Sequence, residues 1–170
     1  MKLISEYYKK QNRLLHESGE KYGQRGVRHL KKIHDLKEEY GCNTILDYGC
    51  GTGTLSKKLE GVVNYDPGIP EFDIMPEQAD LVVCTDVLEH IEPELLGNVL
   101  KHLHILTNKC AFFSIATRYD SSKLLPDGTN PHKIVKSVAW WSKTLSDYFV
   151  IERVRPLIGE VEIVCTPLSR

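Results

Sequence analysis

The sequence lacks a long apolar run. None of its 170 residues belongs to a stretch near the roughly 18 consecutive apolar residues that a membrane span requires. Residues 1–10 also lack the apolar core of a signal peptide, so we expect neither a secretory signal nor contact with a membrane. With 41% hydrophobic and 26% charged residues, the composition is that of an ordinary globular domain.

Paired cysteines are absent as well. The five cysteines are odd in number and scattered, and none forms a C-x-x-C pair: Cys42, Cys50, Cys84, Cys110 and Cys165. This pattern disfavours a zinc site and a disulfide framework. We expect free, mostly buried thiols in a reducing compartment and place the protein in the cytoplasm.

Basic residues are missing from the middle of the chain. No lysine or arginine occurs between Lys58 and Lys101, where there are ten acidic residues. Such a segment suits a cationic ligand. Residues 1–40 instead hold ten lysines and arginines against six acidic residues. We interpret this basic start as a solvated helix face, the alternative being an edge that docks an anionic acceptor such as nucleic acid or a phosphorylated sugar.

Helical and strand patterns alternate along the chain. Helices are expected over residues 3–19, 24–40, 55–59, 93–106 and 137–147, with Gly23 and Gly26 marking the break between the first two. Strands are expected over residues 44–48, 62–65, 81–85, 110–115, 149–154 and 161–165. The alternation predicts an α/β fold with a mostly parallel sheet covered on both faces, and the last two strands an antiparallel hairpin at one edge. We expect one domain over residues 1–170, with residues 1–41 as a helical cap on a core of residues 42–170.

A glycine-rich turn follows the first predicted strand. Gly49, Gly51 and Gly53 alternate there, and glycines let the backbone approach a ligand closely. The spacing is not the G-x-G-x-x-G of dinucleotide enzymes, and no G-K-[ST] typical of NTPases occurs. By itself the turn also fits a tight bend without a ligand. However, Asp66 ends the next predicted strand, where its two oxygens can accept from two ribose hydroxyls. Together these features indicate an adenosine whose 5′ side carries no pyrophosphate.

Three motifs occur in order over residues 45–90: ILDYGCGTG, NYDPG and DLVVCTDVLEHI. Together they resemble the nucleotide half of class I S-adenosylmethionine-dependent methyltransferases. LPDGTNPHK, followed by Trp140 and Trp141, resembles a short subfamily found in bacteriophage and bacteria. The resemblance implies a Rossmann-like three-layer sandwich, and S-adenosylmethionine as the cofactor.

The resemblance also assigns cofactor contacts to ten residues. By the part of the cofactor they would contact, these are Gly49, Cys50, Gly51 and Gly53 for the methionine and ribose portions, Asp47 for the amino group, Asp66 for the ribose, Pro67 and Asp73 for the adenine, and Thr85 and Asp86 beside the methionine moiety.

The chain departs from the family between the second and fourth strands. Only thirteen residues, three of them prolines, separate Asp66 from Asp80. This is too short for a helix, a strand and a helix, and prolines remove backbone donors that a helix needs. We therefore predict a loop here, with the third strand absent or vestigial. The strand ending at Asp66 would then lie near a sheet edge and need covering by the N-terminal helices or by a second subunit, so both a monomer and a homodimer are compatible.

Two histidines are candidates for the base that takes the proton of an oxygen or nitrogen acceptor. His132 is preferred because it lies in a loop after the strand at 110–115, on the ligand side of the predicted sheet. His90 follows the strand at 81–85 and is interpreted more readily as structural or cofactor-adjacent. Asp86, Glu89, His90 and His132 also resemble the metal site of RNA 3′-end ribose methyltransferases, although Asp86 stands where those enzymes have Glu. We expect no metal.

The acceptor is expected to be a small molecule or a sugar-like group, because the chain has no insertion large enough for a macromolecular platform. No D-P-P-Y-type sequence of DNA base methyltransferases follows the fourth strand. Two alternatives remain: a metal-assisted RNA ribose 2′-O-methyltransferase, and a catalytically silent cofactor-binding subunit. Arg25 and Arg28 are expected at the surface, with the cofactor carboxylate as an alternative partner.

Overall fold

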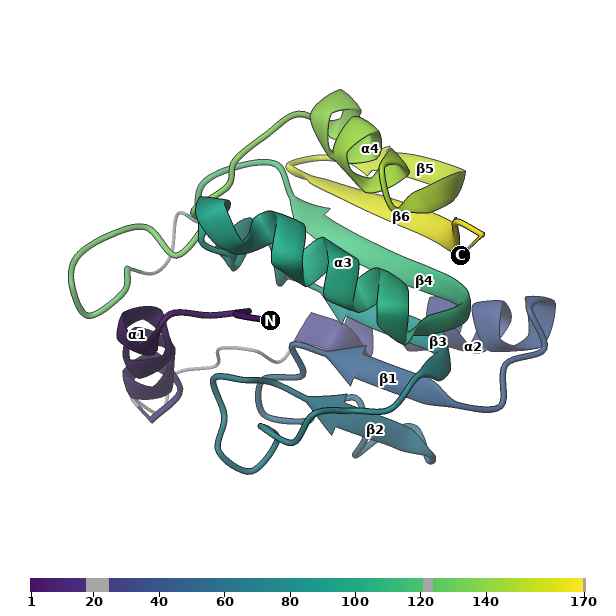
Figure 1. The fold of residues 1–170 in the computed structure, drawn as a ribbon, viewed down its shortest axis with the longest axis horizontal. Helices are drawn as coiled ribbons and strands as arrows, with labels where there is room; N and C mark the ends of the chain where they lie inside the picture. Colours follow the sequence, from purple (N-terminus) through teal and green to yellow (C-terminus); the bar gives the residue numbers. More distant parts are fainter. Residues whose placement is uncertain (18–24, 121–123, 170) are drawn as a thin grey trace.

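One six-stranded sheet organises the molecule (Figure 1). The computed structural model describes residues 1–17, 25–120 and 124–169. The strand order is β2-β1-β3-β4-β6-β5; β2, β1, β3 and β4 are parallel, and β6 runs antiparallel to both of its neighbours, β4 and β5. This confirms the predicted sheet with its C-terminal hairpin. The strands are β1 (Ile45–Tyr48), β2 (Val62–Tyr65), β3 (Ala79–Thr85), β4 (Thr107–Ala116), β5 (Phe149–Leu157) and β6 (Glu160–Pro167).

Helices cover both faces of the sheet, which gives the three layers expected. One buried cluster joins α3 (Leu96–Leu106) and α4 (Val138–Ser146) to the strands, and a second joins α2 (Leu30–Glu39) to the opposite face. The central strands are apolar on both sides for this reason. Within α4, Trp141 is fully buried and Trp140 is partly exposed, so one of the two tryptophans belongs to the core.

Short 3-10 helices accompany the longer ones. They are η1 (Arg25–His29), η2 (Leu88–His90) and η3 (Pro93–Leu95). The predicted second helix therefore starts as a 3-10 turn, and α3 is preceded by another that begins at Pro93. The predicted break at Gly23 lies outside the described residues. No helix among the described residues has the length and apolarity to cross a membrane. All five cysteines are free and buried, as expected.

The prediction of a helix at residues 55–59 was wrong. The segment after the glycine-rich turn is a series of turns, in which Lys58 N and Leu59 N both donate to Leu55 O at a distance of 2.9 Å. Left-handed glycines stand on either side, Gly53 with φ +64° and Gly61 with φ +77°. They leave too few residues to offset the cost of nucleating a helix. Leu55 still packs fully buried against the face covered by α2.

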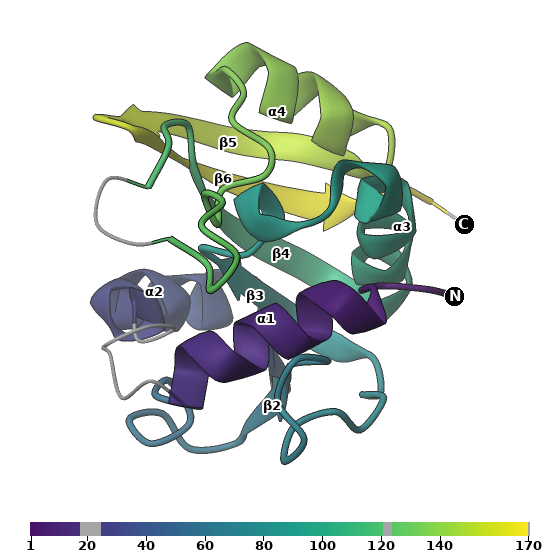
Figure 2. The same cartoon turned by 90° about the vertical axis from the view of Figure 1, so that its left-hand side faces the viewer.

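The shortened flank is confirmed. β2 is an edge strand, and the residues from Asp66 to β3 contain neither a helix nor a strand. They form consecutive turns instead, as when Phe72 N donates to Ile69 O and Asp66 N donates to Phe72 O. The helix α1 (Glu6–Glu17) passes across the carboxyl ends of the strands, and its Lys9 forms an ion pair with Asp73 of this loop (Figure 2). The N-terminal helix therefore covers the end of β2, while the side chain of Val63 remains 55% exposed.

Candidate cofactor and acceptor pocket

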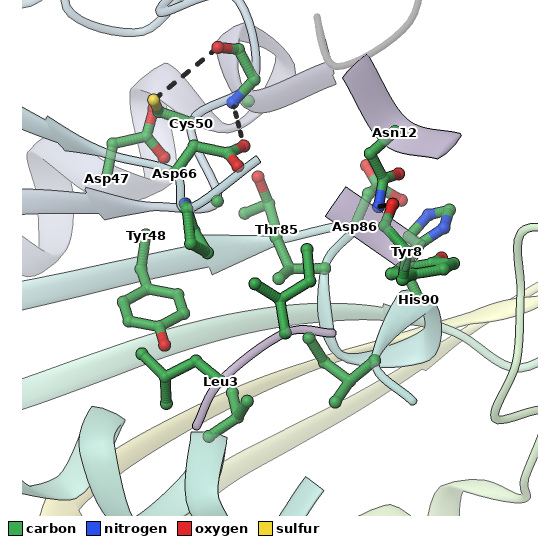
Figure 3. A pocket seen from close by; sticks show the side chains of 18 of the residues that line it. Leu3, Tyr8, Asn12, Asp47, Tyr48, Cys50, Asp66, Thr85, Asp86 and His90 are labelled. Carbon is green, nitrogen blue, oxygen red and sulfur yellow. Dashed lines mark hydrogen bonds between the residues drawn. The ribbon is translucent and has the colours of Figure 1, made fainter. Parts of the chain in front are cut away.

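A pocket opens at the carboxyl ends of β1, β2 and β3 (Figure 3), the edge of the sheet that α1 crosses. Eight of the ten predicted cofactor residues line it, together with both candidate bases: Asp47, Gly49, Cys50, Gly51, Asp66, Pro67, Thr85, Asp86, His90 and His132. Gly53 and Asp73 are not among the lining residues. Gly53 packs against Asn64 and Phe72, and Asp73 is exposed and paired with Lys9.

The glycine-rich turn requires glycine for two reasons. Gly49, Gly51 and Gly53 have φ values of +76°, +52° and +64°, which side chains rarely adopt. In addition, a Cβ on Gly49 would lie 2.3 Å from Cγ2 of Val87, and one on Gly53 would lie 2.9 Å from Nδ2 of Asn64. The turn is also fixed to the end of β2, because Gly49 N donates to Tyr65 O at a distance of 2.7 Å. The glycine pattern therefore reflects a left-handed backbone that packs closely against Val87 and Asn64.

Asp66 links the glycine-rich turn to the turn after β2. Its Oδ2 accepts from Gly51 N at 3.0 Å and its Oδ1 from Gly68 N at 2.8 Å. Each carboxylate oxygen has further lone pairs, so these bonds leave capacity to accept from hydroxyls of a ligand. The carboxylate lies half-buried in the pocket wall. This geometry suits a residue that both shapes the turn and meets a ribose.

Asp47 places a carboxyl group deep in the same end of the pocket. Its side chain is buried, at 4% exposure. Burial, and to a lesser extent the charge of Asp66, raises the pKa of Asp47 to about 7. A cationic group in contact with this carboxylate would favour its ionised form. The amino group of a methionine moiety is such a cation, and Gly49, close to Asp47 in sequence, lines the same pocket. These residues therefore fit S-adenosylmethionine.

His132 and His90 meet where the loop after β4 comes beside η2. Their rings pack edge to face, with centroids 4.8 Å apart. Nδ1 of His132 lies 2.6 Å from Arg118 O, and Nδ1 of His90 lies 3.1 Å from Pro131 O. A carbonyl oxygen only accepts, so Nδ1 of each ring carries the hydrogen of this bond. Nε2 of the buried His132 lies 4.0 Å from Asp120 Oδ2.

Glu89 adds a buried carboxyl group beside the histidines. One ligand atom each from Glu89, His90 and His132 lies within 4.8 Å of the others, and Asp86 is not part of this group. Oε1 of Glu89 accepts from Ala116 N at 2.9 Å, whereas its buried Oε2 has no hydrogen-bond partner among the described residues. Complete burial, and next the charge of Asp86, raises the pKa of Glu89 to about 8. Three of the four residues in the metal-site hypothesis thus lie together.

Asp86 has a strained backbone at the pocket wall. It is the non-glycine residue with a positive φ in the described chain, at +54°. Strain of this kind persists where the surroundings hold it and is concentrated at functional sites. Asp86 N donates to Ser114 O at 2.9 Å, and Asp86 Oδ2 lies 3.4 Å from Arg28 Nη2. The same Arg28 nitrogen pairs more closely, at 2.7 Å, with Glu160 Oε2. Arg28, partly exposed, therefore belongs to a polar network outside the pocket.

The sequence reasoning missed the contribution of α1. Tyr8 and Asn12 of α1 and Ile4, which precedes it, line the pocket, and Figure 3 shows Tyr8 and Asn12 near His90 and Asp86 at one end of it. Their spacing of four residues marks one helix face, a signal that could have been recognised. The hydroxyl of Tyr8 donates to Pro131 O at 3.3 Å, and Ser5 N donates to Glu92 Oε2 at 2.8 Å. These bonds hold α1 over the pocket.

A family model described as a methyltransferase domain matches residues 7–144. No curated protein sequence is significantly similar to the chain. Among solved structures, DhpI in complex with S-adenosylhomocysteine has a TM-score of 0.65 at 14% identity, over 98% of this chain and 100% of that chain. The N-methyltransferase NodS from Bradyrhizobium japonicum has a TM-score of 0.66 at 11% identity, over 94% and 100%. The 1,6-didemethyltoxoflavin-N1-methyltransferase from Burkholderia thailandensis has a TM-score of 0.64 at 14% identity, over 99% and 93%.

At such low identities the solved structures establish the fold, while the family match establishes the lineage. That match spans most of the chain, including the glycine-rich turn, Asp66 and the D-V-L-E-H segment. The sheet order and the pocket at the carboxyl ends of its parallel strands agree with it. The chain therefore belongs to the methyltransferase domain family and is a class I S-adenosylmethionine-dependent methyltransferase.

Proposed function

We propose that this enzyme transfers the methyl group of S-adenosylmethionine to an oxygen or nitrogen of a small-molecule or sugar-like acceptor. The observation that supports this most is the continuity of the pocket. One cavity joins Asp47 and Asp66, which suit the amino group and ribose of the methyl donor, to the basic nitrogen of His132. The acceptor would lie in the part of the pocket between α1 and the two histidines. This space is enclosed, and it therefore favours a small molecule over a macromolecule.

The donor supplies a methyl group on an excellent leaving group, so the protein's task is chiefly alignment. Alignment of two bound reactants supplies up to about 7–11 kcal/mol in favourable cases. Hydrogen bonds fix the glycine-rich turn at one end of the pocket and α1 at the other, so the donor and the acceptor are held in fixed positions relative to each other. His132 takes the proton that the acceptor loses: its Nδ1 is committed to Arg118 O, so Nε2, which faces Asp120 at 4.0 Å, is the nitrogen that acts as the base. His90, held through Pro131 O, packs against the ring and orients it.

The test is transfer of a labelled methyl group from S-adenosylmethionine to a mixture of small molecules. His132→Gln should bind the donor with wild-type affinity and lose turnover, while the exposed His34→Gln on α2 serves as the control. Equal turnover in wild type and His132→Gln would remove His132 from the mechanism. Binding of the donor without any labelled product would contradict the proposed function.

The second candidate is a metal-assisted RNA ribose 2′-O-methyltransferase. The specific observation in its favour is the group of Glu89, His90 and His132, in which Oε2 of Glu89 has no hydrogen-bond partner in the part of the chain that the structure describes. Mixed oxygen and imidazole ligands suit a divalent ion, and each histidine already donates its other ring N–H to a backbone carbonyl. A bound ion would polarise a ribose hydroxyl. Labelling of RNA that disappears on chelation and returns with Mn²⁺ would favour this candidate, and activity unaffected by exhaustive chelation would exclude it.

A further inference from the structure

The apolar lining of the pocket and the kind of base beside it name a class of acceptor, and this inference rests on the function proposed above. We infer that the acceptor is a small molecule with an apolar, conjugated ring, and that a phenol-type hydroxyl on this ring receives the methyl group. Two independent observations support this: aliphatic side chains line the pocket near the candidate bases, and the preferred base is a histidine.

Three aliphatic side chains, Leu3, Ile4 and Ile91, form an apolar wall of the pocket. Leu3 belongs to the main core, whereas Ile4 and Ile91 are only half-buried by the protein itself. Apolar surface inside a cavity gains free energy when a ligand covers it. The hydroxyl groups of a sugar would instead lose hydrogen bonds to water against this wall. The wall therefore favours a ligand with an apolar body.

The apolar wall lies beside the histidines. Ser5 N donates to Glu92 Oε2 at 2.8 Å, and this bond holds the segment that contains Ile4 next to the segment that contains Ile91. Ile91 directly follows His90 in the chain. A ligand within reach of the histidines would therefore also cover the apolar wall.

Aromatic rings complete this part of the pocket. The hydroxyl of Tyr8 donates to Pro131 O at 3.3 Å, and Nδ1 of His90 lies 3.1 Å from the same carbonyl oxygen. Figure 3 shows Tyr8 and His90 next to each other. His132 packs edge to face on His90, and Ile4 packs on the small cluster that contains Tyr8. Rings in such a setting make favourable edge-to-face and offset contacts with a further ring. A conjugated ring therefore suits this space better than a flexible chain.

The base determines which hydroxyl loses its proton. General-base catalysis is most efficient when the acidity of the two groups is not far apart. A phenol-type hydroxyl has a pKa of about 10, as in tyrosine. The hydroxyl of a sugar or another alcohol is a far weaker acid, because no ring delocalises the charge of its anion, and it would need a stronger activating group such as the metal of the second candidate. The imidazole of His132 therefore matches a phenol-type hydroxyl.

The residues then account for the proton. The phenol-type hydroxyl passes its proton to Nε2 of His132. A lone pair of the oxygen forms the O–CH₃ bond while the S–CH₃ bond of the donor breaks, and the electrons of that bond go to sulfur. The products are an aryl methyl ether and a neutral thioether. Asp120 Oδ2, 4.0 Å from Nε2, stabilises the imidazolium formed. The proton leaves from His132 to solvent when the product departs.

The experiment labels the acceptor before it is identified. Tritiated-methyl S-adenosylmethionine is incubated with the enzyme and an extract of small metabolites, freed of protein and RNA, from the cells that naturally make it. The label should enter a compound that a reversed-phase column retains. Hydriodic acid, which cleaves ethers, should release the label as methyl iodide, and mild alkali, which cleaves methyl esters, should not. The parent compound left by this cleavage should absorb at longer wavelength in alkali, as phenolates do.

Three results would overturn the inference. They are label that resists hydriodic acid, label that mild alkali removes, and a parent compound without the shift in alkali. Absence of any labelled product despite donor binding would instead contradict the proposed function.

Pocket variants test whether the apolar wall binds the acceptor. Ile4→Ala and Ile91→Ala each remove carbon atoms that the ring would cover, so each should raise the extract concentration for half-maximal labelling at least about tenfold. Donor affinity in calorimetry should not change. Ile74→Ala is the matched control, because Ile74 is 78% exposed and outside the lining, and it should behave as wild type. Unchanged half-maximal concentrations in both folded pocket variants, or an equal loss of donor affinity, would overturn the inference.

Discussion

Gly49→Ala should damage the protein in two separable ways. The first is conformational, because φ at Gly49 is +76° and the left-handed region costs a residue with a Cβ about 1–2 kcal/mol. The second is steric, because the new Cβ would stand 2.3 Å from Cγ2 and 3.0 Å from Cγ1 of Val87. Overpacking of this kind costs about 1–3 kcal/mol. The free energy of unfolding should therefore fall by about 2–5 kcal/mol.

Gly61→Ala is the matched control for this substitution. Its φ of +77° is nearly identical, but a Cβ there meets nothing within 4 Å. Urea denaturation should show a loss of only about 1–2 kcal/mol for Gly61→Ala. Val87→Ala removes the two methyl groups at 2.3 and 3.0 Å and leaves only the Cβ contact at 3.2 Å. The double variant with Gly49→Ala should therefore be more stable than the sum of the single losses predicts, by about 0.5–3 kcal/mol. Equal losses for Gly49→Ala and Gly61→Ala, or additive losses in the double variant, would refute the role assigned to Val87.

Three further predictions concern the ionisable groups of the pocket. The affinity for S-adenosylmethionine should fall about tenfold in calorimetry from pH 8 to pH 6, because the cofactor ammonium needs Asp47 ionised and its pKa is about 7; Asp47→Asn should weaken binding and remove this pH dependence. Glu89 has a folded-state pKa of about 8, above its ordinary value of 4.5, so its contribution to the stability of the folded protein is full below pH 4.5 and is lost as the pH rises through 8. The thermal midpoint of the protein without ligand should therefore fall between these pH values, and it should fall less steeply in Glu89→Gln. His132→Gln should lower turnover by about 10²–10⁴-fold without weakening donor binding, and a smaller loss at every pH would argue against general-base catalysis.

Much of the fold could be predicted because the strands carry strong local patterns. The run at Thr44–Tyr48, the turn after it and the acidic residue ending the next strand are all close in sequence. The shortened flank was predictable from chain length and prolines alone, since thirteen residues cannot form the missing elements. Local rules failed at residues 55–59, where the left-handed glycines on either side override a helical pattern.

The cofactor end of the pocket was easier to predict than the acceptor end. Asp47, Asp66 and the glycines belong to contiguous motifs, so their meeting follows from parallel strands. The acceptor end depends instead on α1 and on the loop after β4, which meet only through tertiary contacts such as Tyr8 to Pro131. The exposed position of Asp73 likewise depends on an ion pair with α1 that no spacing rule reveals.

The most direct test of the account is calorimetric titration with S-adenosylmethionine and S-adenosylhomocysteine. Wild type should bind one equivalent of each, and Asp66→Ala should bind both at least about tenfold more weakly, the loss expected when hydrogen bonds to a charged group are removed. Asp35→Asn, which changes an exposed carboxylate on α2, should bind like wild type. Thermal melts would establish that each variant is folded. Failure of the folded wild type to bind either ligand would contradict the central claim.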